Sequence, residues 1–314
     1  MYYSEIVVVG SLNMDIVIKV DNRPKIGETI HAEKVFYSCG GKGANQAYAA
    51  AKLGGEALLI GIVGNDDFGK TLMANLEQAK VNTESIHTAA DATSGVAIIT
   101  LDKTGENNII LGTGANGAVN KSYIQQNKEY IQNAKLLVIQ LEVPLEAVKE
   151  AIQIAFDNQI PVLLDPAPAQ KLPSDLLEKI DFITPNETEL TKLTDVEVID
   201  LDSAIEASKQ LINKGVKNVF AKLGKEGVVV VNSDLTYFHI EGHIVEVKDT
   251  TSAGDAFAGA LAKKLVDQVS LKEAAIFANE VAAMTVTKYG AQKSIPSLEE
   301  LNSIENKSYK IMEG

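Results

Sequence analysis

The chain has few of the residues that disulfides and metal centres require. Cys39 is the only cysteine among 314 residues, which excludes an intramolecular disulfide and is typical of a protein in a reducing cytosol. The four histidines, His31, His87, His239 and His243, lack the spacing of metal ligands. We therefore expect these histidines on strands or at the surface, and we expect no disulfide framework.

Basic residues and long apolar runs are also scarce. Lys and Arg number 29 against 42 for Asp and Glu, a formal net charge of −13, and no basic run offsets it. This balance argues against nucleic acid as a partner. No apolar stretch approaches the roughly 18 residues of a membrane span, and the N-terminus leads into a strand-like run instead of a signal peptide. We expect a cytoplasmic protein without a membrane partner.

What the chain does contain is a regular alternation of strand-like and helix-like segments. Its composition, 46% hydrophobic and 23% charged, is that of an ordinary globular protein. The alternation predicts an α/β fold with a doubly wound, mostly parallel sheet and helices on both faces. The expected strands are residues 6–9, 58–63, 135–140, 161–164, 180–183 and 218–222, with an antiparallel pair at 226–231 and 236–240. The expected helices are residues 46–53, 71–79, 144–156, 187–193, 203–213 and 270–287.

Two segments break this alternation. Residues 15–20 with 29–37, and residues 94–101 with 107–111, are strand pairs without a helix between them, and the turn cluster at 102–105 makes the second pair a hairpin. Four such strands predict a small sheet that projects from the main body as a lid or an interface. We expect one domain over residues 1–314, with a four-stranded lid formed by about residues 13–37 and 94–112.

The most informative segment is residues 249–260, DTTSAGDAFAGA. Its small residues precede Asp255, which opens a helix that runs to about residue 266. Ala253 and Gly254 leave backbone N–H groups bare at the helix start, and with the helix dipole these groups make an anion site. A carboxylate there repels phosphate, but it can take a proton from a hydroxyl that attacks the phosphate. Taken alone, the segment also fits a tight turn at Gly254 with Asp255 as a cap.

Residues 64–71, GNDDFGKT, satisfy the phosphate-binding pattern GxxxxGK[ST] between a strand and a helix. In a true P-loop, Asp66 and Asp67 would place two negative charges in the phosphate cradle. At a local dielectric near 20, each such contact costs on the order of several kcal/mol. We therefore interpret Lys70 as a solvated residue at the helix start. Residues 112–117, GTGANG, match a dinucleotide pattern, but the next helix begins only near Asn120, so a chain crossing between the lid and the body explains them better.

Two further glycine turns carry polar side chains suited to a polyhydroxyl ligand. Residues 40–47, GGKGANQA, place an amide ahead of a helix, and residues 10–15, GSLNMD, end the first strand with Asn13 and Asp15. Carboxylates accept hydrogen bonds and amides both donate and accept, as sugar hydroxyls require. Each turn alone also fits ordinary turn chemistry.

Seven motifs in order give the chain a family resemblance. It resembles the ribokinase-like family of carbohydrate kinases, which includes fructokinases and adenosine kinases, from about residue 5 to about residue 300. The motifs are residues 10–15, 40–47, 64–69, 165–169, 184–189, 249–257 and 290–296. The resemblance also reassigns the P-loop match, because the family carries a Gly-x-Val-Gly-x-Asp-x-x-Gly turn of this kind.

The resemblance implies roles for individual residues. Asp255 would be the catalytic base beside an anion hole at Ala253 and Gly254. The implied sugar ligands are Asn13, Asp15, Gly41, Lys42, Asn45, Glu142 and Asp255. Asn186 and Glu189 would order Mg²⁺, waters and phosphate. The other implied ATP contacts are Leu223, Gly224, Lys225, Glu226, Gly227, Val228, Gly254 and Asn279.

The resemblance also implies a monovalent-cation site built largely of backbone oxygens. Its implied members are Asp249, Thr251, Thr285, Lys288, Gly290 and Ser294. The departures from the family are mild. Ser252 stands where the family often has Gly or Ala but is still small, and Lys288 and Tyr289 can vary freely if only backbone oxygen binds the cation.

The implied activity is ATP-dependent phosphorylation of D-ribose at O5, giving ribose 5-phosphate, with Mg²⁺, activation by K⁺ and a homodimer formed through the lids. Three alternatives stay open. The chain could be a sister kinase for deoxyribose, another pentose or a nucleoside. It could be a P-loop NTPase, or a sugar-binding regulator that transfers no phosphate.

Overall fold

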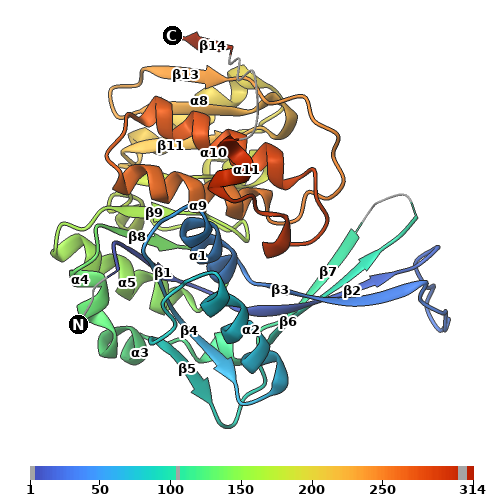
Figure 1. Cartoon of the computed structure of the whole chain (residues 1–314). Helices are drawn as coiled ribbons and strands as arrows, with labels where there is room; N and C mark the ends of the chain where they lie inside the picture. Colours follow the sequence, from blue (N-terminus) through green and yellow to red (C-terminus); the bar gives the residue numbers. More distant parts are fainter. Residues whose placement is uncertain (1–3, 104–106, 303–309) are drawn as a thin grey trace.

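A ten-stranded sheet forms the centre of the protein in the computed structural model, which describes residues 4–103, 107–302 and 310–314 (Figure 1). The strand order is β14-β13-β12-β11-β10-β9-β8-β1-β4-β5. The seven strands from β11 to β5 are parallel, and β12, β13 and β14 pair antiparallel at one edge. The bounds are β1 Ile6–Val9, β4 Ala57–Gly64, β5 Ile86–Ala89, β8 Leu136–Ile139, β9 Val162–Leu164, β10 Phe182–Ile183, β11 Asn218–Lys222, β12 Val228–Asn232, β13 Tyr237–Ile240 and β14 Ile311–Glu313.

Helices cover both faces of this sheet, as the alternation predicts. They are α1 Lys42–Lys52, α2 Asp67–Gln78, α3 Lys121–Gln126, α4 Lys128–Gln132, α5 Leu145–Asp157, α6 Ser174–Leu177, α7 Glu187–Thr194, α8 Leu201–Asn213, α9 Ala253–Val266, α10 Leu271–Thr285 and α11 Leu298–Asn302. Among the described residues, no helix has the length and apolar character to cross a membrane.

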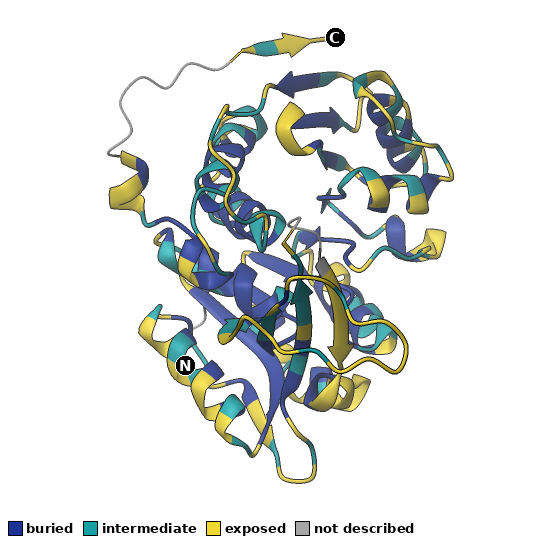
Figure 2. Ribbon diagram, turned by 90° about the vertical axis from the view of Figure 1, so that its right-hand side faces the viewer, coloured by how far each residue is buried: buried dark blue, intermediate teal, exposed yellow. Residues whose placement is uncertain are grey.

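The strand β1 shows why the sheet is covered on both sides. Its four residues are all apolar and fully buried, and they alternate between two cores. Val7 and Val9 pack in the core with α5, α7 and α8, whereas Ile6 and Val8 pack in the core with α1, α9 and α10. Figure 2 shows the central strands and the helix faces against them as buried. Continuous apolar strands of this kind are typical of parallel sheets covered on both faces, and the predicted fold class is confirmed.

The winding of the sheet creates one point where the chain changes direction. The strand β1 pairs with β4 on one side and with β8 on the other. From β1 the chain adds β4 and β5 outward, and from β8 it adds β9, β10 and β11 in the opposite direction. The loops after β1 and β8 therefore diverge at the carboxyl ends of two neighbouring strands, the place where open α/β sheets bind ligands.

One boundary that differs from the sequence analysis is the start of α1. This helix begins at Lys42, not at residue 46. Its first turn lies against the end of β1, where a Cβ on Gly43 would come within 2.6 Å of the Gly10 backbone. The glycines that favour a loop locally are needed here for close packing.

Other boundaries also differ from expectation. The second lid strand begins at Lys34, so residues 29–33 are not part of it, and the short edge strands β5 and β14 were not expected. In the turn expected at 102–105, residues 104 and 105 lie outside the described residues.

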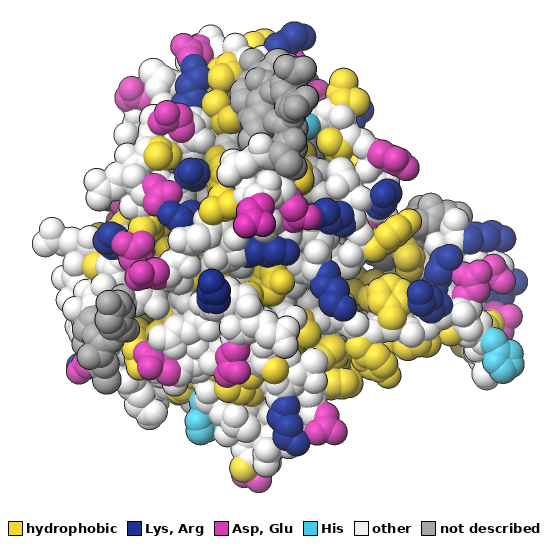
Figure 3. Space-filling view, in the orientation of Figure 1, with side chains coloured by type: hydrophobic (Ala, Val, Ile, Leu, Met, Phe, Trp, Pro, Cys, Tyr) yellow, Lys and Arg dark blue, Asp and Glu magenta, His cyan; other side chains and the backbone are white. Residues whose placement is uncertain are grey.

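A separate four-stranded sheet projects from the body (Figure 1). It contains β2 Asn13–Lys19, β3 Lys34–Gly40, β6 Gly95–Leu101 and β7 Asn107–Gly112, in the order β3-β2-β6-β7. The central pair, β2 and β6, is parallel, and each outer pair is antiparallel. Figure 3 shows hydrophobic side chains along this arm, where Val35, Tyr37, Ile109, Ile110 and Leu111 are among the exposed ones. The expected small sheet is present, while the single-domain division and the role of this sheet as a lid stay predictions.

The turn that matches the P-loop pattern is a helix cap. Asp66 accepts hydrogen bonds from the backbone N–H of Gly69 (2.7 Å) and from both the backbone N–H (2.7 Å) and the hydroxyl (2.6 Å) of Ser94, just before β6. Burial acts to raise the pKa of Asp66, but these hydrogen bonds hold the pKa below its ordinary value. Lys70 is exposed and forms an ion pair with Asp67. The Asp66 carboxylate thus occupies the start of α2, where a P-loop would hold phosphate, and this argues against a phosphate-binding site.

We expect Asp66→Ala to lower the free energy of unfolding by about 1–2 kcal/mol at neutral pH, because it removes a cap that also holds the base of β6. The pKa of Asp66 is depressed in the folded state, so its contribution is present above the ordinary pKa and is lost as pH falls. Urea unfolding should therefore show a smaller difference between variant and parent toward acid pH. Lys70→Ala is the control and should leave stability and ATP affinity nearly unchanged. Equal losses from both variants would contradict this interpretation.

Candidate functional site

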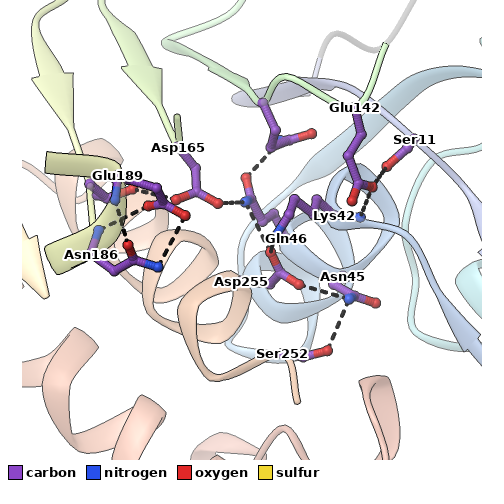
Figure 4. A network of polar contacts seen from close by, with 12 residues as sticks. Ser11, Lys42, Asn45, Gln46, Glu142, Asp165, Asn186, Glu189, Ser252 and Asp255 are labelled. Carbon is purple, nitrogen blue, oxygen red and sulfur yellow. Dashed lines mark hydrogen bonds and ion pairs between the residues drawn. The ribbon is translucent and has the colours of Figure 1, made fainter. Parts of the chain in front are cut away.

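The predicted catalytic carboxylate is buried at the start of α9. Asp255 is only 5% exposed. Its Oδ2 accepts a hydrogen bond from Asn45 Nδ2 (2.8 Å), its Oδ1 accepts one from Gln46 Nε2 (3.3 Å), and Lys42 Nζ lies 3.9 Å from Oδ1 (Figure 4). Burial raises the pKa of Asp255 above its ordinary value, and the charge of Lys42 opposes this rise. The first turn of α1 therefore supplies the donors that hold this carboxylate.

The N-terminus of α9 has no side-chain cap. Ser252 occupies the N-cap position with φ 61°, and its hydroxyl accepts a hydrogen bond from Asn45 Nδ2 (2.9 Å) instead of capping the helix. Ala253 and Gly254 follow as the first helical residues. A Cβ placed on Gly254 would lie 3.2 Å from Lys222 Nζ. An open helix start with an ammonium group beside it is suited to an anion.

The predicted sugar-binding residues gather on the other side of Asp255. Glu142 Oε2 accepts hydrogen bonds from the Ser11 hydroxyl (2.5 Å) and the Lys42 backbone N–H (3.3 Å). Asn116 Nδ2 donates to Asn13 Oδ1 (2.8 Å), and its Oδ1 accepts from the Leu12 backbone N–H. A cavity of about 320 Å³ is lined here by Asn13, Leu111, Gly112, Thr113, Asn116, Leu141, Glu142, Val143, Pro144 and Pro168. Of the predicted sugar residues, Asn13 and Glu142 line this cavity, and Gly41 is the N-cap residue of α1, the helix that carries Lys42 and Asn45.

Charge is unevenly distributed in this region. Burial raises the pKa of Asp15 to about 7, with further contributions from the negative charges of Glu142 and Asp255. Burial alone would lower the pKa of Lys42, but the carboxylates of Asp255, Asp165 and Glu142 raise it above its ordinary value. Lys42 is thus held as a cation among acids, and Asp15 gains or loses its proton near neutral pH.

Asn186 and Glu189 form the start of α7. The Asn186 side chain accepts from the Glu189 backbone N–H (2.8 Å), and Glu189 accepts from the backbone N–H (2.9 Å) and Nδ2 (3.1 Å) of Asn186. Glu189 is buried, which raises its pKa, and the charge of Lys222 opposes that rise. Figure 4 places this pair on the far side of Asp165 from Asp255. The two residues expected to order Mg²⁺ thus lie beside Asp165, with Asp255 on its other side.

The expected ATP loop joins β11 to β12 and contains the short turn Gly224–Glu226. Within it the Leu223 backbone N–H donates to the Gly227 carbonyl (2.8 Å), and His239 Nε2 lies 2.6 Å from the Glu226 carbonyl. Asn279 projects from α10 and donates to the Glu241 carbonyl (3.1 Å). The loop and Asn279 therefore both lie against the chain that leaves β13.

The expected cation site is partly brought together. Asp249 accepts from the backbone N–H groups of Thr251 and Gly290, both at 2.9 Å, and so joins two distant loops. The Thr285, Lys288 and Ser294 side chains bond to the Val281 carbonyl, Glu300 and the Ala291 carbonyl, respectively. Within the part of the chain described, no cluster of three or more His, Cys, Asp or Glu side chains could hold a metal. A cation here would depend on Asp249 and on backbone oxygens.

Several residues at the site received no role from the sequence. Asp165 accepts hydrogen bonds from Lys222 Nζ (2.8 Å), Gln46 Nε2 (2.9 Å) and the Thr184 hydroxyl (3.2 Å). Gln140 in turn donates to Gln46 Oε1 (2.7 Å). The signal that could have found Asp165, Lys222 and Gln140 is position, because each ends or directly follows a strand of the parallel sheet.

Comparisons with known proteins point to one family. A model of the pfkB family of carbohydrate kinases matches residues 4–298. A ribokinase of Haemophilus influenzae is 42% identical over 293 residues, 93% of this chain and 95% of that protein. A deoxyribokinase of Salmonella typhi is 38% identical over 303 residues, 95% of this chain and 97% of that protein. The structure of Arabidopsis thaliana ribokinase complexed with ribose and ATP is 31% identical, with a TM-score of 0.90, and the match covers 96% of this chain and 98% of that one.

The family match over nearly the whole chain and the likeness of sequence and fold to ribokinases confirm the resemblance found in the motifs. This chain is a carbohydrate kinase that belongs to the pfkB family, among its ribokinase-like members.

Proposed function

We propose that this kinase transfers the terminal phosphoryl group of ATP to O5 of D-ribose, giving ribose 5-phosphate. The observation that carries the proposal is the pairing of Asp255, a buried carboxylate, with the uncapped start of α9. A carboxylate at this point can accept the proton of an attacking hydroxyl, while the N–H groups of Ala253 and Gly254 stabilise charge on the transferred phosphoryl group. The similarity to ribokinases supports ribose as the sugar.

The two substrates would approach Asp255 from opposite sides. Ribose would occupy the cavity that Asn13 and Glu142 line, with Asp15, Gly41, Lys42 and Asn45 as its further ligands. ATP would lie along residues 223–228 with its adenine near Asn279, and its phosphates would face Lys222 and the start of α9. Most of the rate enhancement would then come from positioning and electrostatics, as is general for phosphoryl transfer.

The residues present fit Mg²⁺ with the ATP phosphates. Asn186 and Glu189 offer an amide and a buried carboxylate near Asp165, and oxygen ligands of this kind suit Mg²⁺. When bound, the ion would neutralise phosphate charge.

The Asp249 region also fits a monovalent cation. Its carboxylate joins the two loops that carry Thr251 and Gly290, and backbone oxygens of these loops would supply the other ligands. We propose K⁺ as an activator held by Asp249, Thr251, Thr285, Lys288, Gly290 and Ser294.

The second sheet is proposed as a lid over the sugar. Its first residue, Asn13, lines the cavity, as do Leu111 and Gly112 from β7. Its exposed apolar side chains would be buried if the lids of two copies packed together, which supports a homodimer. We also propose the cytoplasm as its location, on the basis of the single cysteine and the carbohydrate-kinase family.

The strongest alternative is a sister kinase that acts on deoxyribose. The similarity to a deoxyribokinase over nearly the full length favours this candidate specifically. Both sugars present the same O5, so the alternatives differ in the sugar contacts and not in the role of Asp255.

We expect Asp255→Asn to reduce turnover by roughly 10²- to 10⁴-fold, the range for a positioned general base, while the affinities for sugar and ATP are retained. The change is nearly isosteric, so the fold should persist. A coupled assay of ADP formation, with binding measured by calorimetry, checks this expectation. Asp157→Asn, at the exposed end of α5, is the matched control. Turnover near the parent level in folded Asp255→Asn would remove Asp255 from the mechanism.

We expect D-ribose to be preferred over 2-deoxy-D-ribose by roughly ten- to a hundredfold in kcat/KM. Without the 2-hydroxyl, a buried polar group such as Asn13 or Asp15 would lose its partner, at a cost of roughly 1–3 kcal/mol. The KM for ATP should be the same with both sugars, which is the internal control. If deoxyribose has an equal or higher kcat/KM, the sugar assignment is wrong and the kinase assignment stands.

We expect K⁺ to raise the rate without contacting either substrate, because a cation at Asp249 would hold the loop that leads to the anion hole. Initial rates at fixed ionic strength in potassium chloride and in tetramethylammonium chloride, whose cation is too large for the site, measure the effect. Asp249→Ala should abolish the difference, whereas Asp234→Ala on the surface should not. Equal rates in both salts, with no effect of Asp249→Ala, would mean that no cation site exists here.

A further inference from the structure

Two buried glutamines form a hydrogen-bonded chain that ends on Asp255. Gln46 and Gln140 are both 0% exposed. Gln140 Nε2 donates to Gln46 Oε1 (2.7 Å), and Gln46 Nε2 donates to Asp165 Oδ2 (2.9 Å) and Asp255 Oδ1 (3.3 Å), as Figure 4 shows for Gln46. The Gln46 amide therefore bridges the carboxylates of Asp165 and Asp255, and the Gln140 amide donates to the Gln46 amide.

The direction of both amides follows from the charges. If the Gln46 amide were turned over, its carbonyl oxygen would face two carboxylates, so its nitrogen must point at Asp165 and Asp255. Its oxygen then points at Gln140, which must present its own nitrogen. Gln140 thus fixes the orientation of Gln46.

This orientation is kept at a cost. Gln140 Oε1 is buried and has no hydrogen-bond partner among the described residues. An unpaired buried carbonyl oxygen is unfavourable. Turning the Gln140 amide over would not help, because its oxygen would then face the oxygen of Gln46. A Cβ on Gly10 would lie 2.1 Å from this oxygen, so the space for Gln140 exists only because residue 10 is glycine. A polar pair that is retained with one group unsatisfied suggests a functional role.

The charges around Asp255 show what the donors contribute. Acids outnumber bases among the ionisable groups around Asp255 and its immediate partners. The acids are Asp15 on β2, Glu142 after β8, Asp165 after β9 and Glu189 on α7, and the bases are Lys42 on α1 and Lys222 on β11. In this surplus of negative charge, N–H donors are needed to keep the Asp255 carboxylate ionised.

We propose that Gln140 and Gln46 are positioning residues for phosphoryl transfer. Gln140 fixes the direction of the Gln46 amide, and Gln46 holds the Asp255 carboxylate ionised and in one orientation toward the sugar hydroxyl. This inference rests on the proposed function, in which Asp255 accepts the hydroxyl proton.

The test is the pH dependence of kcat in Gln46→Met, which keeps a side chain of similar length and removes both donors. Hydrogen bonds to the ionised form lower a carboxyl pKa, so their loss raises it, and the acid limb of the profile should move to higher pH. We expect kcat at neutral pH to fall by roughly tenfold to a hundredfold, with the KM for ATP little changed.

Gln140→Met should move the acid limb in the same direction by a smaller amount, because the Gln46 amide can then turn. Gln153→Met is the matched control, since Gln153 on α5 makes an amide–carboxylate bond to Asp157 (2.7 Å) outside the site. A lower kcat with an unmoved acid limb in both site variants would overturn the proposal, because a merely structural role has that result.

A measurement on the unaltered protein covers the case in which the variants fail to fold. In protein labelled with ¹⁵N-glutamine, one buried side-chain amide should change its chemical shift at the pH of the acid limb, and this titration should vanish in Asp255→Asn. The absence of any such resonance would also overturn the proposal. Full activity of Asp255→Asn would instead refute the proposed base, which is a separate result.

Discussion

The crowding of carboxylates with few cations is the constraint on which the rest of this structure depends. The acids at the carboxyl end of the sheet are Asp15, Glu142, Asp165, Glu189 and Asp255, and among the residues that the structure describes, only Lys42 and Lys222 are cations that lie among them. Buried charges are costly unless they are paired and hydrogen-bonded. The first turn of α1 supplies much of the compensation, with Asn45 and Gln46 donating to Asp255 and the Lys42 backbone donating to Glu142. The position of this helix is therefore tied to the chemistry.

The site separates into two parts that come from different elements. Asp255 and its donors lie on α1 and α9, against the doubly wound sheet. Much of the cavity wall comes from β2, β7 and the loop after β8. A change in the second part can alter the shape of the cavity and leave the donors of Asp255 in place. The chain is similar both to a ribokinase and to a deoxyribokinase, at 42% and 38% identity.

Local patterns in the sequence predict most of the fold. Apolar runs such as residues 6–9 and 218–222 are long enough to identify buried strands, and the observed bounds of β1 and β11 agree with them. The start of α1 was missed because glycines weaken a helix locally, and only packing against β1 explains them. The short strands β5 and β14 lie at the two edges of the sheet and have little periodic signal.

The same reasoning predicts part of the site. Asp255, Asn45 and Lys42 lie in motifs that stand out along the chain, and the structure brings them together. Gln140 and Lys222 could not be assigned in this way, because each acts through residues that are distant in the sequence. Their importance depends on which strands are neighbours in the sheet, and no local pattern contains that information.

The parallel pairing of β2 with β6 also has a consequence for the order of folding. The hairpin β6–β7 can form from neighbouring residues, but the pairing of β2 with β6 closes a loop that contains β3, α1, β4, α2 and β5. Closing so long a loop has an entropic cost that local hairpins do not have. The second sheet should therefore be completed later than its own hairpin β6–β7, once the chain between β2 and β6 has become ordered.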